Sequence, residues 1–170
     1  MSQIRKFSFV YDAAEDRLAC DTELTDDATA RLWLTQRFCR GFVLAILPIL
    51  ERSVATDEAH QALVQSWEQV AALSDFGQTP AVETTAQSSV GLVHSAHLTP
   101  LERGIDIALE FKALEAGADG VQSMALAFPE VRQMLSAMHS LHLAAGWPVD
   151  GWPAWITDPA ALAAPADSVN

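Results

Sequence analysis

The chain is poor in the residues that carry metal, redox and phosphate chemistry. Two of its 170 residues are cysteines, Cys20 and Cys39, and their spacing matches no redox or zinc motif. We expect two free, buried thiols in a reducing compartment rather than a disulfide. The sequence also has no glycine-rich phosphate loop and no Gly-x-Ser-x-Gly turn. These absences give no support to a P-loop nucleotidase, a serine hydrolase or a thiol oxidoreductase.

Basic residues are scarce as well. Ten Lys and Arg stand against 22 Asp and Glu, which gives a net charge of −12 at pH 7. The chain through Arg52 holds 7 basic and 8 acidic residues, whereas the part from Ser53 onward holds 3 and 14. Because nonspecific affinity for nucleic acid depends on Lys and Arg displacing counterions, nucleic acid is not an expected partner. The acidic second part leaves a basic partner as a weaker alternative.

Long apolar runs are missing too. The longest, from Phe42 to Leu50, is too short to cross a bilayer, and the amino terminus lacks the apolar core of a secretory signal. We therefore expect a soluble cytoplasmic protein with no membrane partner. No motif points to a cofactor.

What the chain does contain is strand-like alternation that changes to helical spacing. Phe7, Phe9 and Tyr11 alternate with other residues, as in a strand with one buried face, and acidic clusters that favour turns follow. The predicted elements of this first unit are strands at 6–11, 17–22 and 28–34 and a helix from the N-cap Thr35 to about Arg52. Pro48 is predicted to bend the last turn of that helix.

A similar order of elements follows in residues 89–145. Ile105, Ile107, Leu109 and Phe111 give the cleanest alternation in the chain. The predicted elements of this second unit are a strand with Val90, Leu92, His94, Ala96 and Leu98 on one face, strands at 105–111 and 121–128, and a helix from Pro129 to the C-cap Gly146. A further helix is expected within 56–76, with Leu63, Trp67 and Val70 on its apolar stripe.

These patterns predict an α+β fold. It would consist of two pseudo-repeated halves, each with three antiparallel strands followed by a helix, and an additional helix between them. Length and composition fit a single domain at 1–158 with interdependent lobes at 1–76 and 89–156. Residues 77–88 read as the linker, and 159–170 as a frayed Ala/Pro-rich tail.

The segment from Arg31 to Arg37 reads Arg-Leu-Trp-Leu-Thr-Gln-Arg and is followed by Phe38 and an aliphatic helix. In this motif the chain resembles a group of small uncharacterised bacterial proteins that share a strand, the same short motif and a helix. The later pattern from Gly91 to Trp147 is similar to that group as well. The resemblance implies a related fold, but it implies no activity, cofactor or catalytic residue. Gly41 and Pro48 depart from the pattern within the helix.

Two arginines and two histidines are the candidate ligand-binding residues. Arg37 and Arg40 lie near the amino end of the predicted helix, where exposed amides and guanidinium groups favour anions, although solvation of the helix or ordinary surface pairing is the favoured explanation. His94 and His142 could join them in a cleft between the lobes. His94 and His97 are three apart on a strand and should face opposite sides, so we predict no metal site.

Two functional classes follow, and neither includes an identified catalytic residue. The first, which we favour, is a noncatalytic protein–protein interaction or assembly module that self-associates as a homodimer or binds another protein. The reason for this prediction is the apolar first helix, whose exposed face would include Phe42 and Val43. Trp147, Trp152 and Trp155 would either pack on the protein's own lobes or contact a partner. The second class is a small-ligand or anion-binding protein, conceivably an enzyme.

Overall fold

A computed structural model describes residues 2–54, 57, 60–74, 77, 80–114 and 117–163 of the chain. It is a mixed α+β fold, as the sequence predicts. The described elements are β1 (Ser2–Asp12), β2 (Arg17–Leu24), β3 (Thr29–Leu34), α1 (Gln36–Ser53), α2 (Gln61–Ser74), β4 (Ser89–Leu101), β5 (Gly104–Ala113), β6 (Gly120–Ala127), α3 (Phe128–Ala145), α4 (Ala154–Thr157) and α5 (Pro159–Ala163). The last two short helices are not among the predicted elements.

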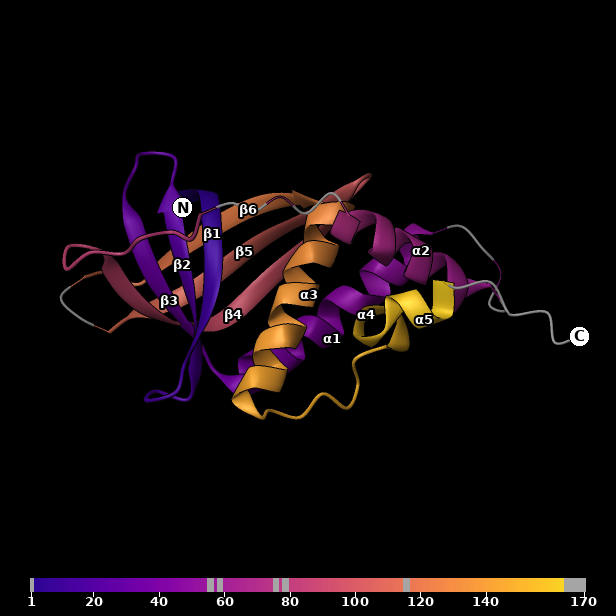
Figure 1. Ribbon diagram of the computed structural model, residues 1–170. Coiled ribbons are helices and arrows are strands. Elements are labelled where there is room, and N and C mark those ends of the chain that lie inside the picture. The colour runs from indigo at the N-terminus through magenta and orange to yellow at the C-terminus, as the bar shows by residue number, and fades with distance from the viewer. Residues whose placement is uncertain are drawn as a thin grey trace, which may run out of the picture.

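The six strands form one closed barrel in the order β1-β2-β3-β4-β5-β6. Each consecutive trio is an antiparallel meander, and the two meanders meet through parallel pairs, β3 with β4 and β1 with β6. Figure 1 shows the strands on one side of the molecule and the helices on the other. The two parallel seams differ in length, because β3 and β4 pair at four positions whereas β1 and β6 pair at two, Ser2 with Gln122 and Gln3 with Ser123.

The acidic turns form as expected. The Asp12 carboxylate accepts from the backbone N–H groups of Ala14 and Glu15 at 2.9 and 3.1 Å, which closes the β1–β2 turn. Asp16 and Asp27 adopt left-handed backbone angles, with φ of 48° and 65°. Aspartate tolerates this conformation better than most side chains, so both turns suit the residues that form them.

Helix α1 begins and ends where the sequence predicts. The Thr35 hydroxyl accepts from the Phe38 N–H at 3.2 Å, and the helix continues through Pro48 to Ser53. Its buried side chains extend around much of its circumference and belong to the same core as the inner faces of the strands. Helix α3 is closed at its far end by Gly146, whose φ of 67° matches the predicted left-handed cap.

The first half of β4 corrects the predicted face. The strand register shifts between Val93 and Ser95, which leaves His94 as an extra residue in a β-bulge. Val93 is buried and His94 is exposed, the reverse of the prediction, whereas Ala96 and Leu98 pack against the core. A bulge inverts the alternation locally, and nothing in a period-2 pattern reveals it.

Helix α2 presents the opposite face from the one predicted. Its buried side chains are mostly polar, namely Gln65, Ser66, Gln69 and Ala72, whereas Trp67 and Val70 are exposed. The glutamines are buried because they have backbone partners: Gln65 Nε2 donates to Leu50 O at 3.0 Å and Gln69 Nε2 to Arg132 O at 3.2 Å. Residues 56 and 76, the predicted ends of this helix, lie outside the described residues.

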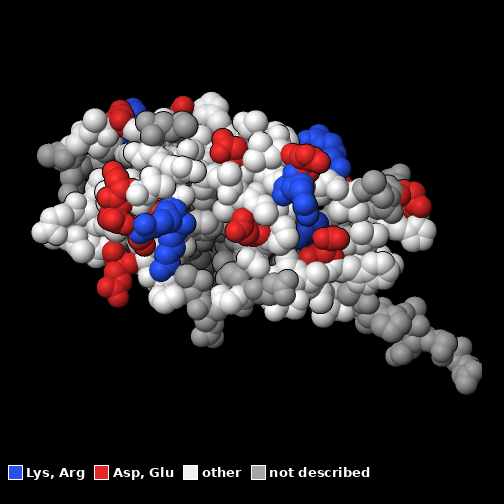
Figure 2. All heavy atoms as spheres, turned by 90° about the horizontal axis from the view of Figure 1, so that it is seen from above, with Lys and Arg blue, Asp and Glu red and all other residues white. Residues whose placement is uncertain are grey.

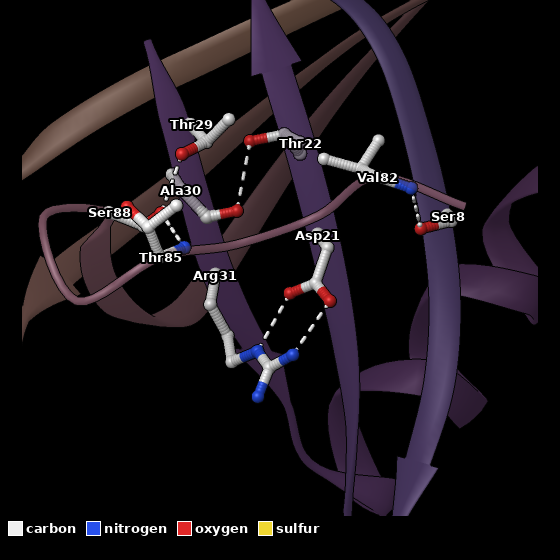
Figure 3. Close-up of polar contacts among 9 residues, drawn as sticks. All are labelled: Ser8, Asp21, Thr22, Thr29, Ala30, Arg31, Val82, Thr85 and Ser88. Carbon is white, nitrogen blue, oxygen red and sulfur yellow. Dashed lines mark hydrogen bonds and ion pairs between the residues drawn. The ribbon is translucent and has the colours of Figure 1, made fainter. Parts of the chain in front are cut away.

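The segment predicted as a linker lies across the outer surface of the first meander. Figure 3 shows it crossing β3, β2 and β1. The Val82 N–H donates to the Ser8 hydroxyl at 3.0 Å, and the hydroxyls of Thr29 and Ser88 are hydrogen bonded. Asp21 and Arg31 form a bidentate pair beside it, at 2.7 and 2.8 Å. The described part of this segment is therefore attached to the barrel.

The carboxyl-terminal segment packs against the helices. Helix α2 contacts α3, α4 and α5, and the side chains of Trp155 and Ile156 on α4 are buried. Helix α5 occupies the start of the segment predicted to be a frayed tail, and residues 164–170 lie outside the described part. The division into lobes and linker remains a prediction.

Candidate functional site

A groove of about 670 Å³ lies between β1 and α3. Beyond Gln3, β1 pairs with β2 on one side, and no strand of the described chain pairs with its other edge. Strand β6 pairs with β1 only at Gln122 and Ser123, so the two strands separate beyond that point. The groove therefore has an open backbone edge as one wall, since every second residue of β1 directs its N–H and C=O outward.

The opposite wall is one face of α3. Glu130, Gln133, Met134 and Ala137 line the groove, and their spacing of three and four places them on one side of the helix. From β1, Phe7 and Phe9 contribute half-buried rings whose centroids lie 5.5 Å apart. Leu126 of β6, together with Gly77 and Pro80 from the segment between α2 and β4, adds to a largely apolar lining. Such a volume and lining are typical of sites that bind a ligand or a chain segment.

The charged side chains around the groove differ in whether they already have a partner within the protein. Arg5 forms ion pairs with both Glu23 and Asp27, the second at 2.6 Å, and these carboxylates raise its pKa. The Glu130 carboxylate accepts from the Ala127 N–H at 2.7 Å, where it caps α3. Lys6 also lines the groove, and its side chain forms no hydrogen bond or ion pair with any described residue. Lys6 is thus the cation of the groove that remains available to a ligand.

The face of the molecule seen from above carries both signs of charge. Figure 2 shows the molecule from above, with Lys and Arg side chains lying beside Asp and Glu side chains. The basic side chains on this face form no continuous area. A surface of this kind does not match a phosphate backbone, which requires adjacent positive charges.

The structure brings together two of the four predicted ligand-binding residues. Arg40 and His142 line one crevice, together with Asp150 and Trp152. Its volume is about 20 Å³, which holds little more than a single water molecule. Arg37 and His94 do not line it: Arg37 is exposed on the first turn of α1, and His94 is exposed on β4. Arg40 and His142 therefore share only a small surface crevice.

His142 holds the segment after α3 in place. Its side chain is buried, its Nδ1 is hydrogen bonded to the Met138 carbonyl at 2.7 Å, and its ring meets those of Trp147 and Trp152 at centroid distances of 5.1 and 5.3 Å. Burial lowers the pKa of His142, and the Met138 hydrogen bond opposes this effect. The neighbouring His139 has its pKa lowered by burial and by His142. Both histidines thus favour the neutral form.

Four of the five residues predicted for an interaction surface are packed inside the molecule. Phe42, Val43, Trp147 and Trp155 are each less than 10% exposed, and Trp152 is half-buried. The indole Nε1 of Trp147 donates to the Asp16 carboxylate at 2.9 Å, which attaches this segment to the β1–β2 turn. The surface that is accessible near them is formed by Trp152 and by Leu44, which is 48% exposed.

The thiols and imidazoles do not form a metal centre in the described chain. Cys20 and Cys39 are free and buried, as predicted, and burial raises the pKa of Cys39 to about 12. His97 Nε2 lies 3.1 Å from Glu110, and both His94 and His97 are exposed on β4 because the bulge breaks the alternation between them. No cluster of three His, Cys, Asp or Glu side chains suited to a metal ion occurs among the described residues.

No membrane-spanning helix is found among the described residues.

The groove residues are absent from the sequence-based candidates. The alternation of Phe7 and Phe9 identifies β1 as a strand, and the spacing of Met134 and Ala137 is visible in the predicted helix. What these patterns omit is that β1 lacks a partner on one edge. That property depends on pairing between β1 and β6, which are more than 100 residues apart in sequence.

Comparison with known proteins gives no match: no family model, no curated protein and no solved structure matches the chain. The resemblance to small bacterial proteins through the Arg31–Arg37 motif remains a prediction.

Proposed function

We propose that this protein is a noncatalytic protein–protein interaction module that binds its partner in the groove between β1 and α3. The observation that carries the proposal is the open backbone edge of β1 beside an apolar wall on α3. Unpaired strand edges are the sites at which proteins add chain segments, and native proteins normally cover or blunt them. An edge combined with a groove is therefore better suited to a protein partner than to a small metabolite.

The engaged polar groups of the groove support a noncatalytic role. Arg5 is held by two carboxylates and Glu130 caps its own helix, so neither is available as an acid or a base. A general acid or base must reach its substrate with a suitable pKa. The proposal accordingly includes no cofactor and no nucleic-acid partner.

A substitution on the groove wall tests this function. Ala137 is partly exposed and lines the groove, so Ala137→Trp should fill it, whereas Ser140→Trp adds the same ring at an exposed site of α3 outside it. We expect affinity capture from the native host, followed by mass spectrometry, to recover a partner with the wild-type chain and with Ser140→Trp, but not with Ala137→Trp. Equal recovery by all three would contradict a groove-based function.

Self-association is a further part of the proposal, through the apolar surface at Leu44 and Trp152. Leu44 is exposed and lies against Gly151. An exposed apolar surface of this kind could be buried against the same surface of a second copy in a symmetric dimer. Leu44→Glu should convert the dimer to a monomer in sedimentation equilibrium at micromolar concentrations, and a wild-type chain that is monomeric throughout that range would remove this part.

The alternative function, binding of a small ligand or anion, has less support. The crevice that joins Arg40 and His142 is far smaller than the 300 to 1,000 Å³ of ordinary ligand sites. It would need to open considerably to admit a ligand.

The order of elements supports one further proposal. Both meanders are followed directly by an 18-residue helix, α1 or α3. We propose that the two halves are pseudo-repeats of one unit and that α2, α4 and α5 are additions to it.

A further inference from the structure

From the geometry of the groove we infer that the partner segment binds as an extended strand, antiparallel to β1, with an acidic side chain or a terminal carboxylate next to Lys6. This inference rests on the proposed function and specifies what occupies the groove.

The open edges define the backbone conformation of the ligand. Five consecutive residues of β1, from Arg5 to Phe9, line the groove and span about 17 Å. An extended segment alongside them would satisfy the outward N–H and C=O groups. Strand β6 is parallel to β1 and its edge is also open beyond Ser123, so one segment antiparallel to β1 is antiparallel to both strands. A lipid chain would leave these backbone groups without partners.

The walls admit one strand and not the edge of a second folded copy. If β1 of a second copy were paired with β1 in the groove, β2 of that copy would lie about 4.8 Å further out on the other side of its β1. The groove is bounded by Leu126 of β6 and by the side chains of α3, including Met134, where that second strand would have to lie. A single segment from a partner is therefore the occupant that fits.

Charge specifies the chemistry of one end of the segment. Lys6 lies at the β6 end of the groove, where β1 begins to separate, and it is the uncommitted cation there. A segment antiparallel to β1 brings its carboxyl-terminal part to this end. An acidic residue at that place would pair with Lys6, and alternate apolar side chains would face Phe7, Phe9 and the α3 wall.

Defined peptides test this inference on the full chain. The probe is an N-acetylated, C-amidated nonapeptide of alternating threonine and valine with a carboxyl-terminal aspartate. Its relatives carry a terminal lysine in place of the aspartate or N-methyl groups on alternate backbone amides. Binding is measured by calorimetry, and hydrogen exchange reports the amides of residues 5–9. We expect the aspartate peptide to bind and to slow exchange of the outward amides of β1.

Each comparison has a defined expected change. N-methylation, which removes the ligand's backbone donors, should weaken binding on the order of thirtyfold. The lysine peptide should bind the wild-type chain roughly fivefold more weakly than the aspartate peptide does. The aspartate peptide should likewise bind the Lys6→Glu variant roughly fivefold more weakly than it binds the wild-type chain. Ala137→Trp should abolish binding and Ser140→Trp should leave it unchanged, with circular dichroism confirming that both variants are folded.

Three results would overturn the inference. The first is equal affinity for the N-methylated peptide, which would mean that backbone pairing does not matter. The second is binding of dodecanoate with no protection of β1 amides, which would identify a lipid site. The third is absence of peptide binding while host capture still depends on Ala137, which would leave the interaction function standing and remove strand addition.

Discussion

Arg132 lies in the middle of α3 with 2% of its surface exposed, and its side chain contacts residues of α2 and α4. Its guanidinium donates to the side chain and the backbone carbonyl of Gln65 and lies 5.2 Å from the centre of the Trp155 ring. Burial lowers the pKa of Arg132 to about 10, so the group remains charged at neutral pH. This charge is stabilised by amide oxygens and by an aromatic ring, and these contacts connect α3 to α2 and α4.

Replacing Arg132 should show this dependence. Arg132→Met leaves the side-chain oxygen of Gln65 buried without a donor, which typically costs about 1–3 kcal/mol of unfolding free energy. Gln65→Met also loses the bond to Leu50 O. Because the double variant removes both partners of the Arg132–Gln65 bond, its loss should be smaller than the sum of the two single losses. Urea unfolding of all four proteins measures the coupling, and strictly additive losses would show that the contact contributes nothing.

The histidines near the end of α3 give the protein a defined pH response. The pKa values of His139 and His142 are lowered in the folded state, so the unfolded chain binds protons more readily near its ordinary value of about 6.5. The contribution of the two neutral histidines to the free energy of unfolding is therefore complete above a pH of about 6.5, and it is lost as the pH falls below that value. The groups that face His142 are Arg40 of α1, Asp150 of the following loop and His139 of its own helix.

We expect the melting temperature to fall between pH 7.5 and pH 5.5 and the fall to be smaller in His142→Gln. Protonation of a buried imidazole beside Trp147 and Trp152 is the physical reason. His94→Gln is the matched control, because His94 is exposed. An identical pH slope in wild type and His142→Gln, measured by differential scanning calorimetry, would assign the response to other groups.

At the scale of elements, two glycines show how position decides the effect of one methyl group. Gly41 is in α1, and a Cβ at that position would meet no atom within 4 Å. At Gly91 of β4, a Cβ would lie 2.3 Å from Cδ2 of Phe111. Phe111 of β5 covers this position, so β4 must approach it without a side chain.

Gly41→Ala and Gly91→Ala should therefore change stability in opposite directions. The first should raise the unfolding free energy by about 0.5–1 kcal/mol, because alanine restricts the unfolded chain and favours a helix interior. The second should lower it by about 1–3 kcal/mol through overpacking. Phe111→Leu should recover part of the loss in the Gly91→Ala background. Thermal unfolding gives the sign of each change, and a stabilising Gly91→Ala would show that the strands can move apart.

The elements also show where sequence reasoning ends. The three strands and helix of each unit follow from local patterns, since Thr35 and Gly146 act within a few residues of the helices they limit. The bulge at His94 and the polar face of α2 depend on what lies opposite. The glutamines of α2 read as a solvent-exposed face until Arg132 and Leu50 are known to face them. The positions of the candidate residues depend on the same long-range information, because local patterns do not reveal that Arg40 and His142 line one crevice that Arg37 and His94 do not line.

At the scale of the whole molecule, the two meanders share one core. Leu18 of β2 and Ile105 of β5 belong to a single buried cluster that also includes residues of α1 and α3. In the barrel interior, the Thr22 hydroxyl donates to the Gln122 side chain at 2.8 Å, which joins β2 to β6. Neither meander buries its inner face alone, so each depends on the other for the burial that stabilises it.

This dependence predicts one cooperative unfolding transition. Trp33 reports on the first meander, Trp147 and Trp155 report on the carboxyl-terminal segment, and far-ultraviolet circular dichroism reports on all elements. In urea, the fluorescence and dichroism midpoints should coincide, and Gly91→Ala should shift both by the same amount although Trp33 lies in the other meander. If one half unfolded first, the midpoints would separate and the substitution would move only one of them. Such a result would mean that the parallel seams join two bodies with separate cores, and the groove at the shorter seam would then open with each local unfolding event rather than form a fixed binding site.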